Sequence, residues 1–529
     1  MNKFMKKTTI ASVMRGICYS FAALLFAASC ANDDVAQENK QKKDNIPAGT
    51  TVFTGTSQTE VTTRTAILNH TKGSDASVNW SSTDKIWVKD DGGNWQQSGA
   101  VTFPFATNKA HGKFALSGSY TGSTHDILYT NKAVSGTQPQ VEIKATQTQS
   151  APNNFDHAGE SGDCGIAIGN KAGNDYDFTL NHKAAYLCFI PRTSNEYVKR
   201  SKLFKVEIMS DDDIAGTYNI AANGTLTLAS GGSKTITVTT GSGFAIDNSA
   251  DDMSKNATYA VVAPGTHTFR IRYWLRNTTD NPDGTIEGTI SKYVTLNCTA
   301  GSIQDITANL DPHEYDGNHY YMWDAQEQFW KGNEWNLGGS QPSVNGNTTT
   351  DYAKNNSDTR FYHEGTGLFQ ATTSLFKDLP NANEMAWYAS NGDPRYDADE
   401  LWITMNHLYK GGLWLKKKVY ISGFNANSAP DMTDWRTIDK NQMWSIPNTL
   451  PLATDMNKYF YIPALGFYDV NGLAGTSIAK LRSLGLAGPC WSSSSNSSPD
   501  QAYILTFYNG FIGVSHGGRY AGYSLQVFE

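Results

Sequence analysis

The sequence predicts a mainly β protein that is divided into several domains. Charged residues make up only 18% of the chain, whereas Gly, Tyr and Phe are abundant. Short apolar runs, such as residues 459–467, 502–508 and 523–528, are bounded by Gly, Asn and Ser, a pattern typical of buried strands. At 529 residues the chain exceeds the size of one domain, so we expect two to four.

The first residues predict a signal peptide over residues 1–29. Lys3, Lys6 and Lys7 precede an apolar stretch at 16–26, and small residues then lead to Cys30. This ending resembles a bacterial lipobox, although Ala27 stands where Leu is more common. The resemblance implies cleavage before Cys30 and lipidation of its thiol. The alternative is an ordinary signal peptide with a chance cysteine.

Residues 30–48 are polar and predict a flexible linker. The acidic pair Asp33 and Asp34 resembles the surface-export signal of Bacteroidetes lipoproteins. No later stretch approaches the roughly 18 apolar residues of a membrane span, so the lipid would be the anchor. The net charge of −7, without a basic patch, excludes a nucleic-acid partner.

Residues 49–175 predict a first β-sandwich. Period-two runs at 50–55, 77–80, 85–89, 112–116 and 126–130 each predict a short strand. The order TRT, then Val78-x-Trp80, then Thr83-Asp84-Lys85-Ile86 resembles the opening of Bacteroidetes fimbrillins, which are pilus proteins. The resemblance implies two tandem transthyretin-like β-sandwich pilin domains.

Arg64 is the candidate site of proteolytic maturation. Some fimbrillins are cut by an arginine-specific protease near the first strand, and a strand from another pilin then fills the opened groove. By resemblance, other pilin subunits are the expected partners through donor-strand complementation. The alternative is an ordinary surface arginine in a flexible segment.

Residues 176–312 predict a second β-sandwich. Phe178, His182, Ala185 and Leu187 match the F-x-x-x-H-x-x-A-x-L strand of the fimbrillin pattern. His182 has no second ligand at suitable spacing, so we expect a structural histidine and no metal site. Asp283-Gly284 predicts a hairpin between the runs 266–277 and 285–297.

Four cysteines remain after the signal segment and Cys30: Cys164, Cys188, Cys298 and Cys490. Their spacing does not fit zinc, and we expect Cys188 and Cys298, which lie in strand-like runs, to be small buried apolar residues. A Cys164–Cys188 disulfide is left open.

Residues 313–529 predict an α+β C-terminal module. Residues 381–389 form the best short-helix candidate, and Asn391-Gly392-Asp393-Pro394 would end it. The order Leu465-Gly466-Phe467, Trp491-Ser492-Ser493, then AYILTF resembles the "major paralogous" domain of bacterial surface proteins, whose fold is similar to the C-type lectin fold. An adhesive role is what this resemblance implies.

Trp491, Ser492, Ser493 and Asp500 are the candidate ligand-binding residues. An exposed aromatic face would suit the apolar face of a sugar, and Ser and Asp would suit its hydroxyl groups. A buried Trp491 with serines that bond the backbone is the competing interpretation. Ser498-Pro499-Asp500 is only a weak match to a lectin calcium motif, so we expect no cofactor, with calcium as the alternative.

No catalytic residues are predicted. The sequence lacks a G-x-S-x-G elbow, an HExxH motif and a phosphate loop, and Ser515-His516 would point to opposite faces of a strand. We therefore expect a non-enzymatic protein.

The expected function is that of a cell-surface, outer-membrane fimbrillin-like pilus subunit, assembled by strand exchange and found in the fimbrium after maturation. An accessory or tip adhesin is favoured because the sequence runs into the predicted last strand, leaving no strand to donate. Its C-terminal module would bind a host glycan or protein. The alternative is an uncleaved surface lipoprotein that never polymerises.

Overall fold

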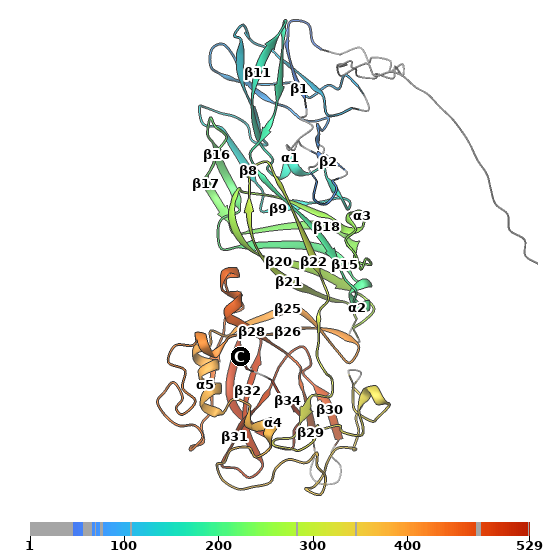
Figure 1. The fold of residues 1–529 in the computed structure, drawn as a ribbon, viewed down its shortest axis with the longest axis vertical. Helices are drawn as coiled ribbons and strands as arrows, with labels where there is room; N and C mark the ends of the chain where they lie inside the picture. Colours follow the sequence, from blue (N-terminus) through green and yellow to red (C-terminus); the bar gives the residue numbers. More distant parts are fainter. Residues whose placement is uncertain are drawn as a thin grey trace, which may run out of the picture. The chain divides into compact units, whose positions relative to one another are not determined.

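The computed structural model describes residues 46–56, 66–68, 70–74, 78–105, 108–281, 284–343, 346–471, 478–526 and 528–529. Strands dominate, and the helices are short, so the prediction of a mainly β fold is confirmed (Figure 1). Within the described ranges, no helix has the length and apolar character needed to cross a membrane.

The first sheet is built around an aromatic core. Its strand order is β5-β4-β7-β11-β12-β1-β6, with β13 paired to β11. Phe53, Trp80, Phe114, Tyr176 and Phe178 are buried together in this core. The strands are β1 (Thr51–Thr56), β4 (Trp87–Lys89), β5 (Trp95–Gln97), β6 (Gly112–Leu116), β7 (Thr124–Tyr129), β11 (Gly165–Ala172), β12 (Asp175–Thr179) and β13 (Asn181–His182).

A small sheet of order β10-β2-β3 contains the strand that follows Arg64 in sequence. Strand β2 pairs antiparallel with both neighbours. Helix α1 (Ala158–Ser161) follows β10. The strands are β2 (Ala66–Leu68), β3 (Val78–Asn79) and β10 (Asn154–Phe155).

The second core lies among three sheets, of orders β19-β14-β22, β17-β16-β8 and β28-β26-β25-β21-β20-β15-β18-β9, the last with β23 paired to β25. Seven of the eight residues of β14 are buried, as expected for an unbroken apolar run. The elements are β8 (Gln140–Ile143), β9 (Thr146–Thr148), β14 (Ala185–Arg192), α2 (Glu196–Lys199), β15 (Lys202–Ser210), β16 (Ala215–Ile220), β17 (Leu226–Ser233), β18 (Thr235–Ala245), α3 (Met253–Asn256), β19 (Thr258–Val262), β20 (Gly265–Asn277), β21 (Ile286–Cys298), β22 (Ile303–Asn309) and β23 (His313–Glu314).

The hairpin predicted around Asp283-Gly284 is confirmed in its two strands. β20 and β21 pair antiparallel along their whole length, from Gly265↔Cys298 to Asn277↔Ile286. The pairing follows the alternation of apolar and polar residues in both strands.

Hydrogen bonding crosses both of the domain boundaries predicted from the sequence. Strands β8 and β9 pair with β16 and β18, beyond residue 176. Strand β25 (Arg395–Thr404) pairs with β21 through Thr289↔Glu400, across residue 312. The division at 175/176 and 312/313 stays a prediction.

The C-terminal region contains a sheet of order β24-β34-β31-β32-β33-β27 and a two-stranded sheet, β29-β30. Helix α5 (Ala382–Asn391) lies where the sequence predicts a helix, and the Asn381 side chain caps its first turn together with Glu384. The remaining elements are β24 (Tyr320–Tyr321), η1 (Trp335–Leu337), α4 (Ser374–Lys377), β26 (His407–Lys416), η2 (Lys418–Tyr420), β27 (Gln442–Ser445), η3 (Ala453–Lys458), β28 (Tyr459–Pro463), β29 (Phe467–Asn471), β30 (Ile478–Arg482), β31 (Cys490–Ser495), β32 (Gln501–Tyr508), β33 (Phe511–Gly518) and β34 (Tyr523–Ser524).

The expected last strand, residues 523–528, is shorter than predicted. Among the described residues of this run, Tyr523–Ser524 alone pairs as a strand, between β24 and β31. Phe528 instead packs against the rings of Tyr388 and Phe460, because these rings offer an apolar contact away from the sheet. The expectation of a strand to residue 528 was therefore wrong.

Candidate functional site

Four of the predicted site residues, Cys30, Asp33, Asp34 and Arg64, lie outside the described residues. Lipidation, export and cleavage at these positions stay predictions. The described elements that flank Arg64 in sequence are β1, which ends at Thr56, and β2, which begins at Ala66.

Strand β1 is an interior strand of the first sheet. It pairs parallel with β12 and antiparallel with β6, so hydrogen bonds hold both of its edges. The Phe53 side chain is completely buried, stacks on Tyr176 at 4.7 Å between ring centroids, and meets Tyr120 edge-on. Figure 1 shows β1 near β11, and β12 pairs with both strands. Removing β1 would therefore open a groove with an aromatic floor and two unpaired strand edges.

Gly55 lies directly against this aromatic floor. A Cβ atom at position 55 would come within 2.8 Å of Phe178 Cζ and 3.0 Å of Trp80 Cζ2. Both rings are packed in the core, so neither can move aside cheaply. The groove accepts a large side chain at position 53 but none at position 55.

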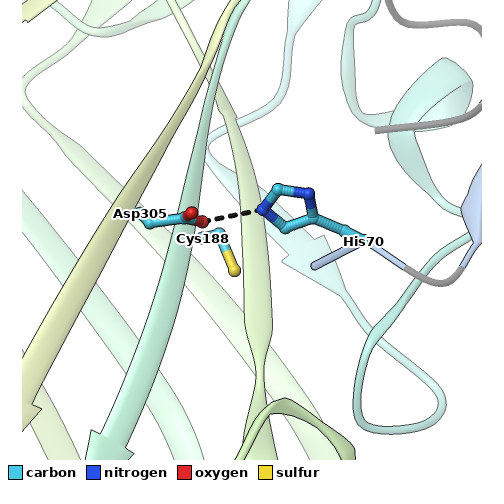
Figure 2. Close-up of side chains that lie close together, drawn as sticks. All are labelled: His70, Cys188 and Asp305. Atoms are coloured by element: carbon cyan, nitrogen blue, oxygen red, sulfur yellow. Dashed lines mark hydrogen bonds and ion pairs between the residues drawn. The ribbon is translucent and has the colours of Figure 1, made fainter. Parts of the chain in front are cut away.

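The chain that follows Arg64 is held to a different part of the protein. His70 Nε2 lies 2.8 Å from Asp305 Oδ1, and the Gly73 N–H donates to Asp305 Oδ2 at 2.6 Å. Figure 2 shows the ring of His70 pointing at Asp305, with Cys188 beside the carboxylate. Burial alone would raise the pKa of Asp305, but the bonds from His70 and Gly73 lower that pKa below its ordinary value. We call residues 70–73 with Asp305 the His70 anchor.

His70, Cys188 and Asp305 could together hold a metal ion, since their ligand atoms lie within 4.8 Å of one another. The set of donors would suit zinc. However, a zinc-bound histidine normally donates its other ring N–H, and His70 Nδ1 is buried without a partner. Burial raises the pKa of the Cys188 thiol well above its ordinary value, which favours the neutral thiol. The hydrogen bonds from His70 and Gly73 to Asp305 fit an anchor rather than a metal site.

Trp491, Ser492 and Ser493 are buried in the C-terminal module. The indole N–H of Trp491 donates to the Tyr321 carbonyl at 2.7 Å, and its ring packs on Tyr523. The backbone N–H of Ser493 donates to the Pro380 carbonyl, and its carbonyl accepts from Ala371. A sugar platform needs an exposed ring face, so the interpretation of Trp491 as a ligand-binding ring is wrong.

Asp500 is exposed, unlike the other three candidates. Its backbone carbonyl accepts the Arg519 N–H at 2.7 Å. Among the described residues, the His/Cys/Asp/Glu groups that could hold an ion do not include Asp500. Ligand or calcium binding by Asp500 stays a prediction.

Within the described part of the chain, Ser515 with His516 and Ser161 with His157 both lack the geometry of a catalytic pair. Ser515 and His516 occupy successive positions of β33 and so face opposite sides of the sheet. His157 Nδ1 lies 2.8 Å from Ser161 Oγ, but both residues are buried, and burial lowers the pKa of His157 to about 4. A buried pair of this kind offers no access to a substrate.

The four described cysteines are free and buried, so Cys164 and Cys188 form no disulfide. His182 is also buried, with Nδ1 2.8 Å from Asp163 Oδ1, as expected for a structural histidine. The His70 anchor was missed in the sequence, because His70 and Asp305 are 235 positions apart. The one sequence feature that could have pointed to this anchor is that His70 lies within the motif over residues 64–86.

No protein-family model and no curated protein match the chain. The fold is similar to several solved structures. A "putative cell adhesion protein" from Bacteroides ovatus ATCC 8483 is 14% identical, with a TM-score of 0.30 over 49% of this chain and 92% of the other. A fimbrial protein from the same strain is 11% identical, with a TM-score of 0.24 over 90% and 98%. The fimbrial anchor protein Mfa2 from Porphyromonas gingivalis is 7% identical, with a TM-score of 0.21 over 47% and 99%.

Proposed function

We propose that the chain is a cell-surface pilus subunit of the fimbrillin type that assembles by strand exchange. Cleavage at Arg64 would release β1 from the first sheet. A strand from another pilin subunit would then pair with β12 and β6 in its place, through main-chain bonds and side chains at alternate positions.

The position of β1 carries this proposal. The strand precedes Arg64 in sequence, lies between two hydrogen-bonded neighbours, and covers an aromatic core. The next described segment is fastened elsewhere, through His70 to Asp305 and through Lys72 to Asp251. A cut between these segments would free β1 while leaving residues 70–73 in place.

The described residues near position 529 are bonded within their own module. Tyr523 and Ser524 are paired within their own sheet. The Glu529 carbonyl accepts the backbone N–H of Lys418 at 2.7 Å and the hydroxyl of Tyr388 at 3.0 Å. A segment held in this way is not free to fill the groove of another subunit. The subunit would accept a strand and present the C-terminal module for adhesion to a host glycan or protein.

The route to the surface follows from the predicted leader. Lipidation at Cys30, with Asp33 and Asp34 as export signal, would deliver the precursor to the outer membrane. Maturation would then transfer the subunit from its lipid anchor into the fimbrium.

The N-terminus of the protein on cells tests this proposal. We expect the wild-type protein in purified pili to begin at Thr65, and the Arg64→Ala variant to remain at full length and outside the polymer. A wild-type protein that begins at lipidated Cys30, with no higher-mass assemblies, would instead identify an uncleaved surface lipoprotein.

A further inference from the structure

A polar cavity of about 370 Å³ lies in the C-terminal module, away from Trp491. Three segments contribute to its lining: Asp324 and Gln326, residues 356–359 with 361–364, and Thr372 with Thr373. Its volume lies at the lower end of the range for small-molecule sites. None of the four candidate ligand residues predicted from the sequence lines this cavity.

Asp324 joins two of the segments that line the cavity. This carboxylate is buried and accepts four hydrogen bonds, from the backbone N–H and hydroxyl groups of Thr372 and Thr373, at 2.7–2.9 Å. Asp324 also has a φ of 56°, which is uncommon for a residue other than glycine. Bonds of this kind hold two of the three segments together.

The side chain of Arg519 holds the lining segment around His363 in place. Its guanidinium is fully buried and donates to the carbonyls of His363 and Gly365 at 3.3 and 3.0 Å. The same group lies over the rings of Trp323 and Phe369, at 4.8 and 4.9 Å. The cavity is therefore formed before any ligand arrives, which lowers the entropic cost of binding.

Aromatic and hydroxyl-binding groups meet at the wall of the cavity. The rings of Phe361 and Tyr362 are half-buried, with centroids 4.3 Å apart. Asn356 and Glu364 are exposed beside them and share a 2.9 Å hydrogen bond. An apolar ring face next to amide and carboxylate groups matches the two kinds of surface that a sugar presents.

The charges of the lining favour a neutral ligand. Asp324, Asp358 and Glu364 contribute carboxylates and His363 contributes an imidazole 3.6 Å from Asp324, whereas none of the described residues that line the cavity is Lys or Arg. An anionic sugar would meet like charge here. Two of the carboxylates are already occupied: Asp324 by the threonines, and Asp358 by Arg360, whose guanidinium contacts both oxygens at 2.7–3.2 Å. Calcium would have to displace these bonds at Asp324 and Asp358.

We propose that this cavity is a binding site for a neutral saccharide unit and that binding does not require calcium. The inference rests on the proposed adhesive role of the C-terminal module and names the ligand class of that module. Tyr362 would supply the face on which the sugar ring packs, and Asn356 and Glu364 would bond its hydroxyl groups.

Saturation-transfer NMR on the uncleaved chain tests the proposal. The probes are the methyl glycosides of galactose, glucose, mannose and N-acetylglucosamine. We expect at least one to bind saturably, with the same affinity in calcium and in EDTA. Tyr362→Ala should weaken binding about fivefold, since aromatic contacts of this kind contribute about 1 kcal/mol. Tyr420→Ala, at an exposed tyrosine outside the cavity, should leave it unchanged.

Asn356→Ala provides a second variant on an exposed position, so a folding defect of Tyr362→Ala would not decide the outcome. It should also weaken binding while leaving the melting temperature unchanged. No binding of any probe, loss of binding in EDTA, an equal effect of Tyr420→Ala, or binding of trilysine or sialyllactose in place of the neutral sugars would each overturn the proposal. Sugar binding by a protein that is never cleaved at Arg64 would refute pilus assembly and leave this inference standing.

Discussion

The ring of Phe53 stacks on the ring of Tyr176, with centroids 4.7 Å apart and planes 9° apart. Phe53→Ala should therefore destabilise the uncleaved protein by about 3–5 kcal/mol, the usual cost of removing a buried phenyl ring. Denaturant unfolding measures this change. Phe105→Ala serves as the control, because Phe105 is 42% exposed. Equal effects of the two substitutions would contradict the position of Phe53 in the core.

The close approach of Gly55 to the core predicts that the groove accepts only a strand with a glycine at this position. After cleavage at Arg64, a peptide with the β1 sequence TVFTGT should bind the opened sheet, because it restores the pairs with β6 and β12. The same peptide with Leu at the glycine position should bind at least about fivefold more weakly, since overpacking of a core costs about 1–3 kcal/mol. Fluorescence anisotropy of labelled peptides measures both. Equal binding would show that the incoming strand does not occupy the register of β1.

His70→Ala should release residues 70–73 without disturbing the first sheet. The substitution removes the bond to Asp305 and leaves that partly buried carboxylate with fewer donors, a loss of about 1–3 kcal/mol. Hydrogen exchange should increase at the Gly73 amide, which donates to Asp305. His313→Ala is the matched control, because His313 is exposed. Unchanged exchange at Gly73 would argue against the His70 anchor.

Patterns in the sequence predicted the strands and helices that are determined by residues close together in the chain. The alternation in residues 112–116 gives β6, the runs flanking Asp283-Gly284 give a paired hairpin, and Asn381 with Glu384 caps α5. Each of these depends on residues close together in the chain, so periodicity and capping suffice to find them.

Long-range pairing could not be predicted in the same way. The edge of strand β8 pairs with β16, which lies beyond the expected boundary and about 80 positions further along the chain. The His70 anchor and the carboxylate of Asp324 each join segments that the sequence separates. Trp491 was assigned to the right strand-rich region, but its burial depends on Tyr321 and Tyr523, which no local pattern connects to it.

Glu400 links the pH dependence of stability to the contact between β21 and β25. Its carboxylate accepts hydrogen bonds from the backbone N–H and the hydroxyl of Ser291, at 3.0 and 2.7 Å. Burial, together with the negative charge of Asp397, raises the pKa of Glu400 to about 7, although Arg272 lies close by and opposes the rise. The ordinary value is 4.5, so the folded protein holds this proton more tightly than the unfolded chain does.

The stability that Glu400 contributes should be complete below about pH 4.5 and should be lost as the pH rises through about 7. Glu400→Gln keeps the shape of the side chain and removes its titration, so the melting temperature of this variant should fall less between pH 5 and pH 8 than that of the wild type. Glu314→Gln, at an exposed position, should retain the wild-type pH dependence. Calorimetry of the three proteins measures the difference. Identical pH profiles for Glu400→Gln and the wild type would mean that Glu400 is ionised throughout this range and that Arg272 outweighs its burial.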